Sequence, residues 1–436
     1  MGVLWDCLAK RLAEYPEQSI NENGCDLSYT ELLQQVGLLS GKLIRQRKYG
    51  ILCSCEISKA IAILACFAAG AVAVPMHDRY GKQHSQKIID NIRLSWLIVD
   101  TEIQKIREEI PEDDNLSNTA IIMCTSGTTG MPKGVKLSDG NLLCNMKAIQ
   151  SYFKLSSSDR ICILRPLFHI SALTGEFLVA LYAGAEIYFT GNNTSLAVIA
   201  NAISQDQITV FCTTPTAMPY YCHYLQRVNP HLLRKIVVSG ECLIQPVVEI
   251  MFSTFPNVEF FNGYGLTEAS PRVAALLPEE FVKYPTSVGK PIKGVDIKII
   301  NGELWVHGPN VMQGYYANPT ATAEKLVNNW LHTGDMAQIN EHGFLYIKGR
   351  IDEMIIRAGV NVYPQEIESA LQTSPLVQEA LAFERDGRIV VKIVGEISKK
   401  ETLALCQREL PPYALPDQIE FVKELPKNAV GKLVRH

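Results

Sequence analysis

Ten consecutive residues, 125–134, combine hydroxyl side chains, glycines and one lysine in the order Thr-Ser-Gly-Thr-Thr-Gly-Met-Pro-Lys-Gly. Glycine lets backbone N–H groups approach an anion closely, and Ser and Thr hydroxyls donate to phosphate oxygens. The segment therefore predicts a phosphate-binding loop, although its spacing differs from the P-loop pattern. A flexible Ser/Thr/Gly loop without a ligand is the alternative. The candidate phosphate-binding residues are Thr125, Ser126, Gly127, Thr128, Thr129, Gly130 and Lys133.

Two further clusters place polar groups beside glycines. Residues 262–268 (Asn-Gly-Tyr-Gly-Leu-Thr-Glu) offer an aromatic ring, a hydroxyl and a carboxylate in a glycine turn after a strand predicted over 258–261. This set suits a platform for a base, a contact to phosphate and a Mg²⁺ ligand. Residues 332–335 (His-Thr-Gly-Asp) place the Asp335 carboxylate at a turn, where it could accept hydrogen bonds from ribose hydroxyls.

Two charged, glycine-containing clusters follow toward the C-terminus. One joins residues 349–352 (Gly-Arg-Ile-Asp) to residues 357–364, and the other spans residues 426–432 (Pro-Lys-Asn-Ala-Val-Gly-Lys). Taken singly, Asp335 could be a turn cap and Lys432 a solvated tail residue. Together, the five segments are far more specific than any one of them.

The elements that must position these segments have an alternating α/β pattern. The apolar run 120–124 predicts a buried strand before the first loop. Residues 27–75 and 160–240 alternate helical patterns with short apolar strands, as in a helix predicted over 29–43 and a strand over 235–239. This rhythm indicates a doubly wound α/β fold.

From about residue 291 the sequence becomes rich in strands and turns. Asn301-Gly302 lies between two alternating apolar segments and predicts a hairpin, and a second hairpin is predicted over 336–348. Beyond the charged junction, a strand, helix, strand, strand, helix, strand pattern predicts a small α+β domain. We therefore expect a large N-terminal domain over 1–349, a junction at 350–352 and a small C-terminal domain over 353–436.

The composition is that of an ordinary enzyme. The 436 residues are 47% hydrophobic and 20% charged, with a net charge of -4, and the basic residues are scattered. Nucleic acid and membrane are therefore not expected as partners, since the longest apolar stretch, 60–75, reads as a buried helix running into a strand. Most of the 12 cysteines lie in apolar runs, which indicates reduced core thiols. The N-terminus lacks a signal-peptide pattern, and we expect a cytoplasmic protein.

In chain order, the five segments resemble the adenylate-forming superfamily of acyl- and aryl-CoA synthetases, nonribosomal peptide adenylation domains and firefly luciferase. The resemblance implies the large and small domains above, with a mobile small domain and a hinge at Asp352. It implies catalytic roles for Lys432, Thr267, Glu268 and Arg350, with Glu268 as the Mg²⁺ ligand. Beside the phosphate loop, the implied nucleotide site contains Gly240, Glu241, Asn262, Gly263, Tyr264, Gly265, Thr267, Asp335, Ile347 and Arg350.

The resemblance also implies two half-reactions. A carboxylate attacks the α-phosphate of ATP, and because both are anions, Lys432 and Mg²⁺ must neutralise the charge. Pyrophosphate leaves and an acyl adenylate remains. The small domain then rotates about Asp352, withdraws Lys432 and presents a second face to a thiol. The residues of this thiol-acceptor face are Arg357, Ala358, Gly359 and Val360.

The identity of the acid is less clear from the sequence. Relatives that activate amino acids usually carry an aspartate where this chain has His169, so a plain carboxylic acid is favoured. Glu241 would favour an amino acid if its carboxylate paired with a cation of the substrate, but it could equally be a carboxylate at a helix N-terminus. His169 could be an aromatic wall or an acid–base group, and the wall is favoured. The implied acid pocket contains His169, Ile170, Ser171, Thr174, Gly240, Gly263, Gly265 and Leu266.

Three functions fit these residues. The first is an ATP- and Mg²⁺-dependent acid–thiol ligase that uses CoA; O-succinylbenzoate-CoA ligases are similarly short family members. The second loads the acyl group onto the phosphopantetheine of a carrier protein. The third is a non-catalytic relative that binds an adenylate, which intact Lys432, Glu268 and Asp335 argue against. A monomer or a homodimer is expected.

Overall fold

The computed structural model describes residues 2–77, 82–112, 114–125, 132–191, 195–228, 230–357, 360–426 and 435. Within them, the first large sheet has the strand order β18-β8-β7-β4-β3-β5-β6. Its strands are β3 (Lys48–Ile51), β4 (Val72–Pro75), β5 (Trp96–Val99), β6 (Glu102–Lys105), β7 (Thr119–Thr125), β8 (Lys133–Ser138) and β18 (Gly314–Tyr315). Helix α4 (Lys82–Asn91) covers one face, because its Ile88 and the following residue, Ile92, share an apolar cluster with Val72 and Val74 of β4.

The second large sheet has the order β15-β14-β13-β12-β11-β9-β10-β1-β2 among the described strands. Neighbours from β1 to β13 in this order are parallel, as expected for a doubly wound α/β fold. The strands are β1 (Ser19–Glu22), β2 (Cys25–Ser28), β9 (Arg160–Ile163), β10 (Glu186–Phe189), β11 (Val210–Thr213), β12 (Lys235–Ser239), β13 (Glu259–Gly265), β14 (Arg272–Leu276) and β15 (Lys290–Pro291).

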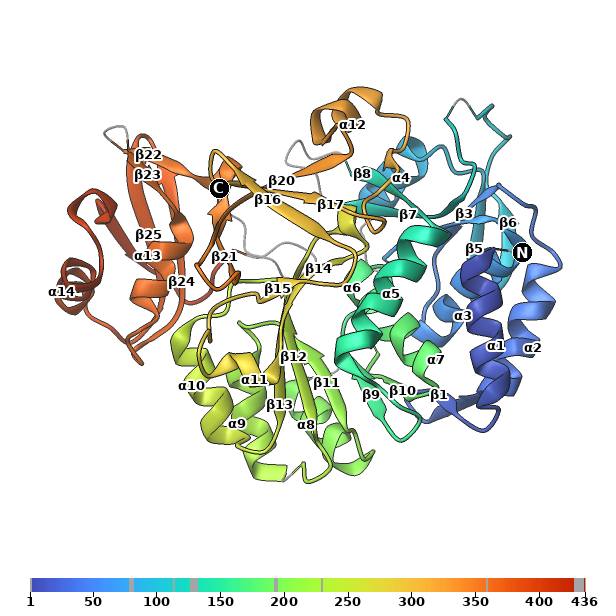
Figure 1. The fold of residues 1–436 in the computed structure, drawn as a ribbon, viewed down its shortest axis with the longest axis horizontal. Helices are drawn as coiled ribbons and strands as arrows, with labels where there is room; N and C mark the ends of the chain where they lie inside the picture. Colours follow the sequence, from blue (N-terminus) through green and yellow to red (C-terminus); the bar gives the residue numbers. More distant parts are fainter. Residues whose placement is uncertain are drawn as a thin grey trace.

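Helices pack between and outside these two sheets (Figure 1). One apolar core joins both sheets through Leu8, Leu64 and Met146, which belong to helices of the inner layer. The inner helices are α1 (Val3–Glu14), α2 (Tyr29–Ser40), α3 (Glu56–Ala69), α5 (Asp139–Phe153) and α7 (Val179–Ala183). A second core lies on the outer face of the second sheet. The helices there are α8 (Leu196–Gln205), α9 (Met218–Val228), α10 (Gln245–Thr254) and α11 (Pro278–Phe281).

A β-rich part follows, as predicted. Asn301 and Gly302 have φ of 50° and 82° and join two strands, and Asn340–Gly343 closes the second predicted hairpin. The strands are β16 (Asp296–Ile300), β17 (Glu303–His307), β19 (Leu326–Val327), β20 (Trp330–Ile339) and β21 (Leu345–Arg350), with helix α12 (Pro319–Lys325) beside them.

The C-terminal part has its own apolar core, which includes Ile367, Val391 and Leu405. It begins after the short turn η3 (Ile351–Glu353), at the predicted junction, and lies to one side of the larger part in Figure 1. The boundary at 350–352 itself stays a prediction. The elements are β22 (Ile355–Arg357), β23 (Val360–Val362), α13 (Pro364–Leu371), β24 (Val377–Arg385), β25 (Arg388–Gly395), α14 (Lys399–Glu409), η4 (Pro412–Ala414) and β26 (Gln418–Phe421).

Two local predictions were wrong. The expected glycine turn at 262–265 is part of β13, because pairing with β12 and β14 on its two sides carries the strand to Gly265. The expected turn at Asp335 lies inside β20, where Gly334 has φ of 77°. Backbone pairing overrode the turn preference of glycine at both places. Among the described helices, none is long and apolar enough to cross a bilayer.

Candidate active site

The ends of the predicted phosphate loop are held by a β-hairpin. Thr125 ends β7 and pairs with Lys133, the first residue of β8, and the Thr125 hydroxyl lies 3.4 Å from the Lys133 carbonyl oxygen. The intervening candidates, residues 126–130, lie outside the described residues. Lys133 Nζ lies 5.2 Å from the centre of the Tyr315 ring, which directs this cation toward the neighbouring strand β18.

Tyr315 connects this hairpin to the predicted Mg²⁺ ligand. Strand β18 pairs with β8, and the Tyr315 hydroxyl donates to Glu268 Oε1 at 2.8 Å. Glu268 and Thr267 lie in the short turn η2 (Thr267–Ala269) after β13. Burial, together with the charge of Glu268, raises the pKa of Tyr315, so the phenol keeps its proton and remains a donor. Tyr315 could not be predicted as a site residue, because nothing in the sequence around it indicates a partner so far away in the chain.

A second polar group forms around Asp335. Its two carboxylate oxygens accept hydrogen bonds from the Tyr264 hydroxyl and from Arg350 Nη1, the latter at 3.2 Å. Asp335 on β20 and Arg350 on β21 are directly paired. Burial and the adjacent Asp335 raise the pKa of Tyr264 well above its ordinary value, so this phenol also stays neutral. A carboxylate has about four acceptor positions, so Asp335 retains capacity for ribose hydroxyls.

The predicted hinge residue belongs to the same network. Asp352 accepts a hydrogen bond from Arg350 Nε at 3.1 Å. Burial opposes the charge of Asp352, but this hydrogen bond and the guanidinium charge hold its pKa below the usual value. A cavity of about 260 Å³ opens here between the hinge and the β-rich part. Its lining residues are Glu303, Glu324, Lys325, His332, Gly334, Arg350, Ile351 and Asp352.

His169 lies among aromatic rings near the predicted acid pocket. Its ring centre is 4.2 Å from that of Phe168, whose ring lies 4.5 Å from His77. Burial lowers the pKa of His169 to about 3, and the nearby charges of Arg165, His77 and Lys59 act in the same direction. The imidazole is therefore neutral near pH 7, which fits the aromatic wall that the sequence favours.

The segment that carries His169 is held from helix α3. Glu56 accepts a hydrogen bond from the backbone N–H of Leu167 at 2.8 Å and forms a buried ion pair with Lys59. Ser171 follows on α6 (Ile170–Ala172), and Thr174 lies in the π-helical turn η1 (Leu173–Leu178). The buried Thr174 hydroxyl has no hydrogen-bond partner among the described residues.

Glu241 has a local partner. Its Oε2 accepts hydrogen bonds from the backbone N–H of Thr216, at 3.1 Å, and from the Thr216 hydroxyl. Thr216 lies two residues before α9, so the geometry favours the helix N-terminal interpretation of Glu241 over a partner for a substrate cation. Gly240 has φ of 98°, a conformation that favours glycine.

The glycines of β13 allow other groups to approach closely. A Cβ at Gly265 would lie 2.0 Å from the carbonyl oxygen of Pro271, and one at Gly263 would lie 1.5 Å from Arg272 Nη1. Leu266 donates its N–H to the same Pro271 carbonyl at 3.0 Å. The buried Asn262 donates to the Ser287 carbonyl oxygen at 2.8 Å and holds the strand in place.

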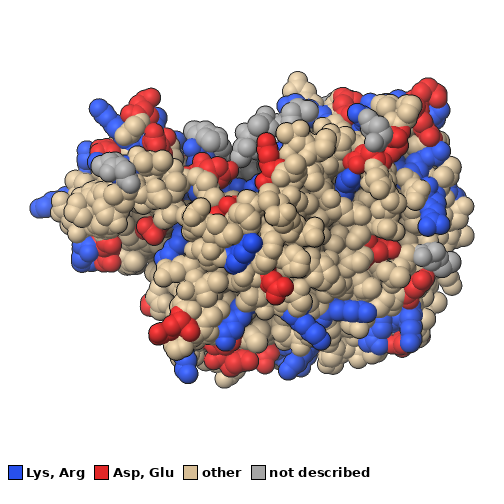
Figure 2. All heavy atoms as spheres, turned by 45° about the horizontal axis from the view of Figure 1, so that its top comes forward, with Lys and Arg blue, Asp and Glu red and all other residues tan. Residues whose placement is uncertain are grey.

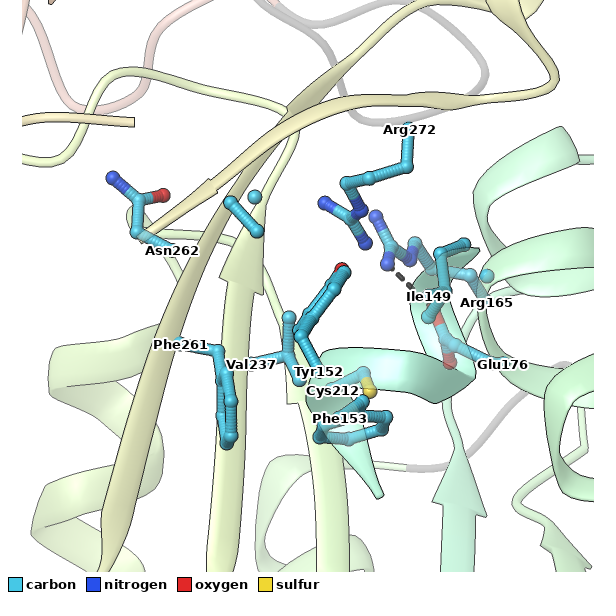
Figure 3. Close-up of a pocket in the computed structure, with 13 residues that line it drawn as sticks. Ile149, Tyr152, Phe153, Arg165, Glu176, Cys212, Val237, Phe261, Asn262 and Arg272 are labelled. Atoms are coloured by element: carbon cyan, nitrogen blue, oxygen red, sulfur yellow. Dashed lines mark hydrogen bonds and ion pairs between the residues drawn. The ribbon is translucent and has the colours of Figure 1, made fainter. Parts of the chain in front are cut away.

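A small cavity of about 10 Å³ lies beside Gly263, and Figure 3 shows Arg165 and Arg272 side by side in it. Neither arginine was predicted from the sequence as a site residue. The only sequence pattern that they share is a position at the end of an apolar strand. Arg165 follows β9, and Arg272 is the first residue of β14. Neither strand pattern showed that the two side chains would meet.

The small domain holds its predicted thiol-face arginine internally. Arg357 donates to the Leu415 carbonyl oxygen at 2.6 Å and to Asp417 at 2.8 Å, and Val360 is exposed. Two other members of that face, Ala358 and Gly359, and the predicted catalytic Lys432 lie outside the described residues. Ile347 is half-buried on β21, and its carbonyl oxygen lies 3.9 Å from Cys242 Sγ.

Comparisons with known proteins agree with this arrangement. Residues 103–316 match the AMP-binding enzyme model, and residues 366–432 match the AMP-binding enzyme C-terminal domain. A 2-succinylbenzoate–CoA ligase of Bacillus velezensis is 30% identical over 88% of this chain and 86% of its own length. One from Oceanobacillus iheyensis is 30% identical over 95% and 94%. The chain belongs to the AMP-binding enzyme family, and the predicted resemblance is confirmed.

Solved structures extend the comparison to the whole fold. The o-succinylbenzoate CoA synthetase (MenE) of Bacillus subtilis, in complex with ATP and magnesium ion, has a TM-score of 0.86 and 26% identity, covering 98% of each chain. The same enzyme in complex with the acyl-adenylate intermediate OSB-AMP also has a TM-score of 0.86, covering 98% of this chain and 96% of that one. The predicted fold class is confirmed.

Proposed function

We propose that this chain activates a carboxylic acid with ATP, releases pyrophosphate, and transfers the acyl group from the resulting adenylate to the thiol of CoA. The observation that carries this proposal is the convergence on Asp335, where groups from three separate strands meet. Tyr264 offers a ring and Asp335 an acceptor, and both are held beside the cation of Arg350. A ring for the base, an acceptor for the ribose and a cation for the phosphate are the groups that a nucleotide needs.

The residues around the phosphate hairpin fit Mg²⁺. The Glu268 carboxylate is the type of oxygen ligand that Mg²⁺ prefers, and Tyr315 orients it from one side. When bound there, the ion would neutralise phosphate charge. Lys133 and Arg350 add positive charge from the protein, which lowers the repulsion between the attacking carboxylate and the α-phosphate. Lys432 remains our candidate for the principal cation of the first half-reaction.

The geometry favours a plain carboxylic acid over an amino acid. His169 is neutral and Glu241 is engaged with Thr216, so neither supplies a dedicated carboxylate for an ammonium group. A buried ammonium without such a partner is costly. The relatives at 29–30% identity are named for 2-succinylbenzoate, and we propose this compound as the first acid to test.

Acid-dependent exchange between ATP and pyrophosphate tests the first half-reaction. We expect exchange with 2-succinylbenzoate or another plain acid, and no exchange with amino acids. Mass spectrometry of the product, with CoA and a holo carrier protein offered in parallel, tests the second half-reaction. An acyl-CoA product is expected. Exclusive loading of the carrier protein would contradict the proposal that CoA is the acceptor. The absence of exchange with every acid would contradict the ligase function.

A further inference from the structure

The small cavity beside Gly263 contains more buried positive charge than negative charge. Arg165 pairs with Glu176 at 2.6 Å, while Arg272, only 5% exposed, has no carboxylate partner among the described residues. Burial raises the pKa of Glu176, although both arginines oppose this shift. One carboxylate supplies at most one negative charge against the two guanidinium groups. A buried cation without an anion is costly, and proteins rarely keep one without use.

Several polar atoms around this cavity also lack hydrogen-bond partners. They are Nε of Arg165, Nε of Arg272 and Oε2 of Glu176, each buried and unpaired within the described part of the chain. One water molecule would fill a cavity of about 10 Å³ and satisfy some of these atoms. Water would not, however, neutralise the charge of Arg272. The site therefore has both the charge and the open hydrogen-bond capacity to receive an anionic group.

The two arginines lie against residues of the predicted acid pocket. A Cβ on Gly263 would overlap Arg272 Nη1, and a Cβ on Gly240 would lie 3.8 Å from Arg165 Nη1. Gly263 directly precedes Tyr264, whose hydroxyl bonds to Asp335 of the nucleotide site. An acid whose reacting carboxylate faces the nucleotide would thus direct its far end toward Arg272.

The backbone of Arg272 is fixed from helix α5. Buried Asn145 accepts a hydrogen bond from the Arg272 N–H at 3.1 Å and donates to the Arg272 carbonyl oxygen at 2.7 Å. Ser239 accepts a hydrogen bond from Arg165 at 3.3 Å. Figure 3 shows the Tyr152 hydroxyl beneath the two guanidinium groups. The backbone of Arg272 and the side chain of Arg165 are therefore held in place, which contributes to a preorganised recognition site.

We propose that Arg272 binds a second anionic group on the acid substrate, and that the Arg165–Glu176 pair positions its guanidinium. The inference rests on the proposed ligase function and deepens it, since it assigns the specificity for a diacid to a residue of this chain. A short aliphatic dicarboxylate and 2-succinylbenzoate share the required chemistry. Because a cavity of about 10 Å³ holds about one water molecule, only the end of the second carboxylate would reach it, at the cavity mouth.

Matched acids test the proposal with the full-length wild-type chain. Exchange between ATP and pyrophosphate is measured with succinate against butyrate, and with 2-succinylbenzoate against 4-oxo-4-phenylbutanoate, which lacks the ring carboxylate. We expect kcat/KM for at least one diacid to exceed that of its monoacid partner by about 10- to 100-fold, the range for one hydrogen bond to a charged group. The pair that shows this preference distinguishes the short acid from the aryl acid.

Variants assign the preference to one residue. Arg272→Met should lower the diacid-to-monoacid ratio about 10- to 100-fold, Arg272→Lys should retain part of it, and Arg408→Met, an exposed arginine on α14, should leave the ratio unchanged. The Lys variant keeps the test valid if the Met variant does not fold. Equal use of monoacids and diacids by the wild type, or an unchanged ratio in both Arg272 variants, would overturn the inference. Failure of every acid would instead refute the ligase function on which the inference rests.

Discussion

The nucleotide site and the acid pocket differ in how their charges are balanced. Around Asp335, each charged group has an opposite charge in contact with it: Arg350 lies between Asp335 and Asp352. In the small cavity beside Gly263, Glu176 pairs with Arg165, and Arg272 has no carboxylate partner among the described residues. A balanced site persists without its ligand, whereas an unbalanced one gains stability when an anion arrives. The difference separates the proposed nucleotide site from the site that we propose for the second anionic group of the acid.

The face of the molecule drawn in Figure 2 shows no corresponding concentration of charge among the described residues. On the face in Figure 2, positive and negative side chains are interspersed over both parts of the molecule. The net charge of the chain is -4. Long-range attraction of an anion needs an extended field of one sign, so the proposed selection of a diacid would rest on the buried arginines.

The largest effect is expected at Lys432. Lys432→Ala should lower acid-dependent pyrophosphate exchange by at least about 100-fold, because a cation at the attacked phosphate is lost. Thioester formation from supplied acyl adenylate should be spared. Lys423→Ala, at an exposed position, is the matched control. Equal loss of both half-reactions would refute the assignment of Lys432 to the first one.

Two glutamates test the comparison directly. Glu176→Gln should lower the free energy of unfolding by about 3 kcal/mol, because it leaves the half-buried guanidinium group of Arg165 without its charge partner, next to the buried Arg272. Glu268→Gln, at a half-buried position, should change the free energy of unfolding by no more than about 1 kcal/mol but reduce exchange strongly. Chemical denaturation and exchange assays of both variants check this. The reverse pattern would contradict the division into a balanced and an unbalanced region.

Asp335 should report on nucleotide binding. Asp335→Asn removes the charge that pairs with Arg350 and weakens one ribose acceptor, so the KM for ATP should rise about tenfold. The KM for the acid should change little. Asp386→Asn, on an exposed turn of the small domain with φ of 53°, is the control, since asparagine tolerates that conformation. A change in the KM for the acid alone would contradict the assignment of Asp335 to the nucleotide site.

The neutral state of buried His169 should make the stability of the fold depend on pH. The folded pKa, about 3, is below the unfolded value, so the unfolded chain binds the extra proton and stability falls as the pH drops from about 6.5 toward 3. His169→Phe removes this contribution. Urea midpoints at pH 7 and pH 5 should therefore differ less in the variant than in the wild type. Loss of most exchange activity in His169→Phe near pH 7 would favour an acid–base role over an aromatic wall.

The smallest effect is expected at Glu241. Glu241→Gln keeps an acceptor for Thr216, and we expect a loss of no more than about 1 kcal/mol in the free energy of unfolding. The set of acids that support exchange should be unchanged. If the variant lost activity toward an acid that carries an amino group, Glu241 would contact the substrate after all.

Prediction from the sequence was most reliable where local patterns decide structure. The strand over 235–239 and the Asn301-Gly302 hairpin were located correctly, because alternation and turn chemistry act over a few residues. Residues 262–265 were placed in a turn, since the pairing of β13 with two neighbours is invisible locally. Tyr315 escaped notice for the same reason: its partners Lys133 and Glu268 are distant in the chain.

The sequence by itself determined the family, and it predicted the nucleotide-handling residues, because the chemistry of phosphate, ribose and Mg²⁺ demands particular residue types at short spacing. Only the tertiary structure decided the charge of the acid pocket. Arg165, Glu176 and Arg272 come from separate segments, and each one alone reads as an ordinary polar residue near an apolar element. Their proposed role follows from their position next to one another inside the protein, since a charge removed from water needs a partner in the protein or in the ligand.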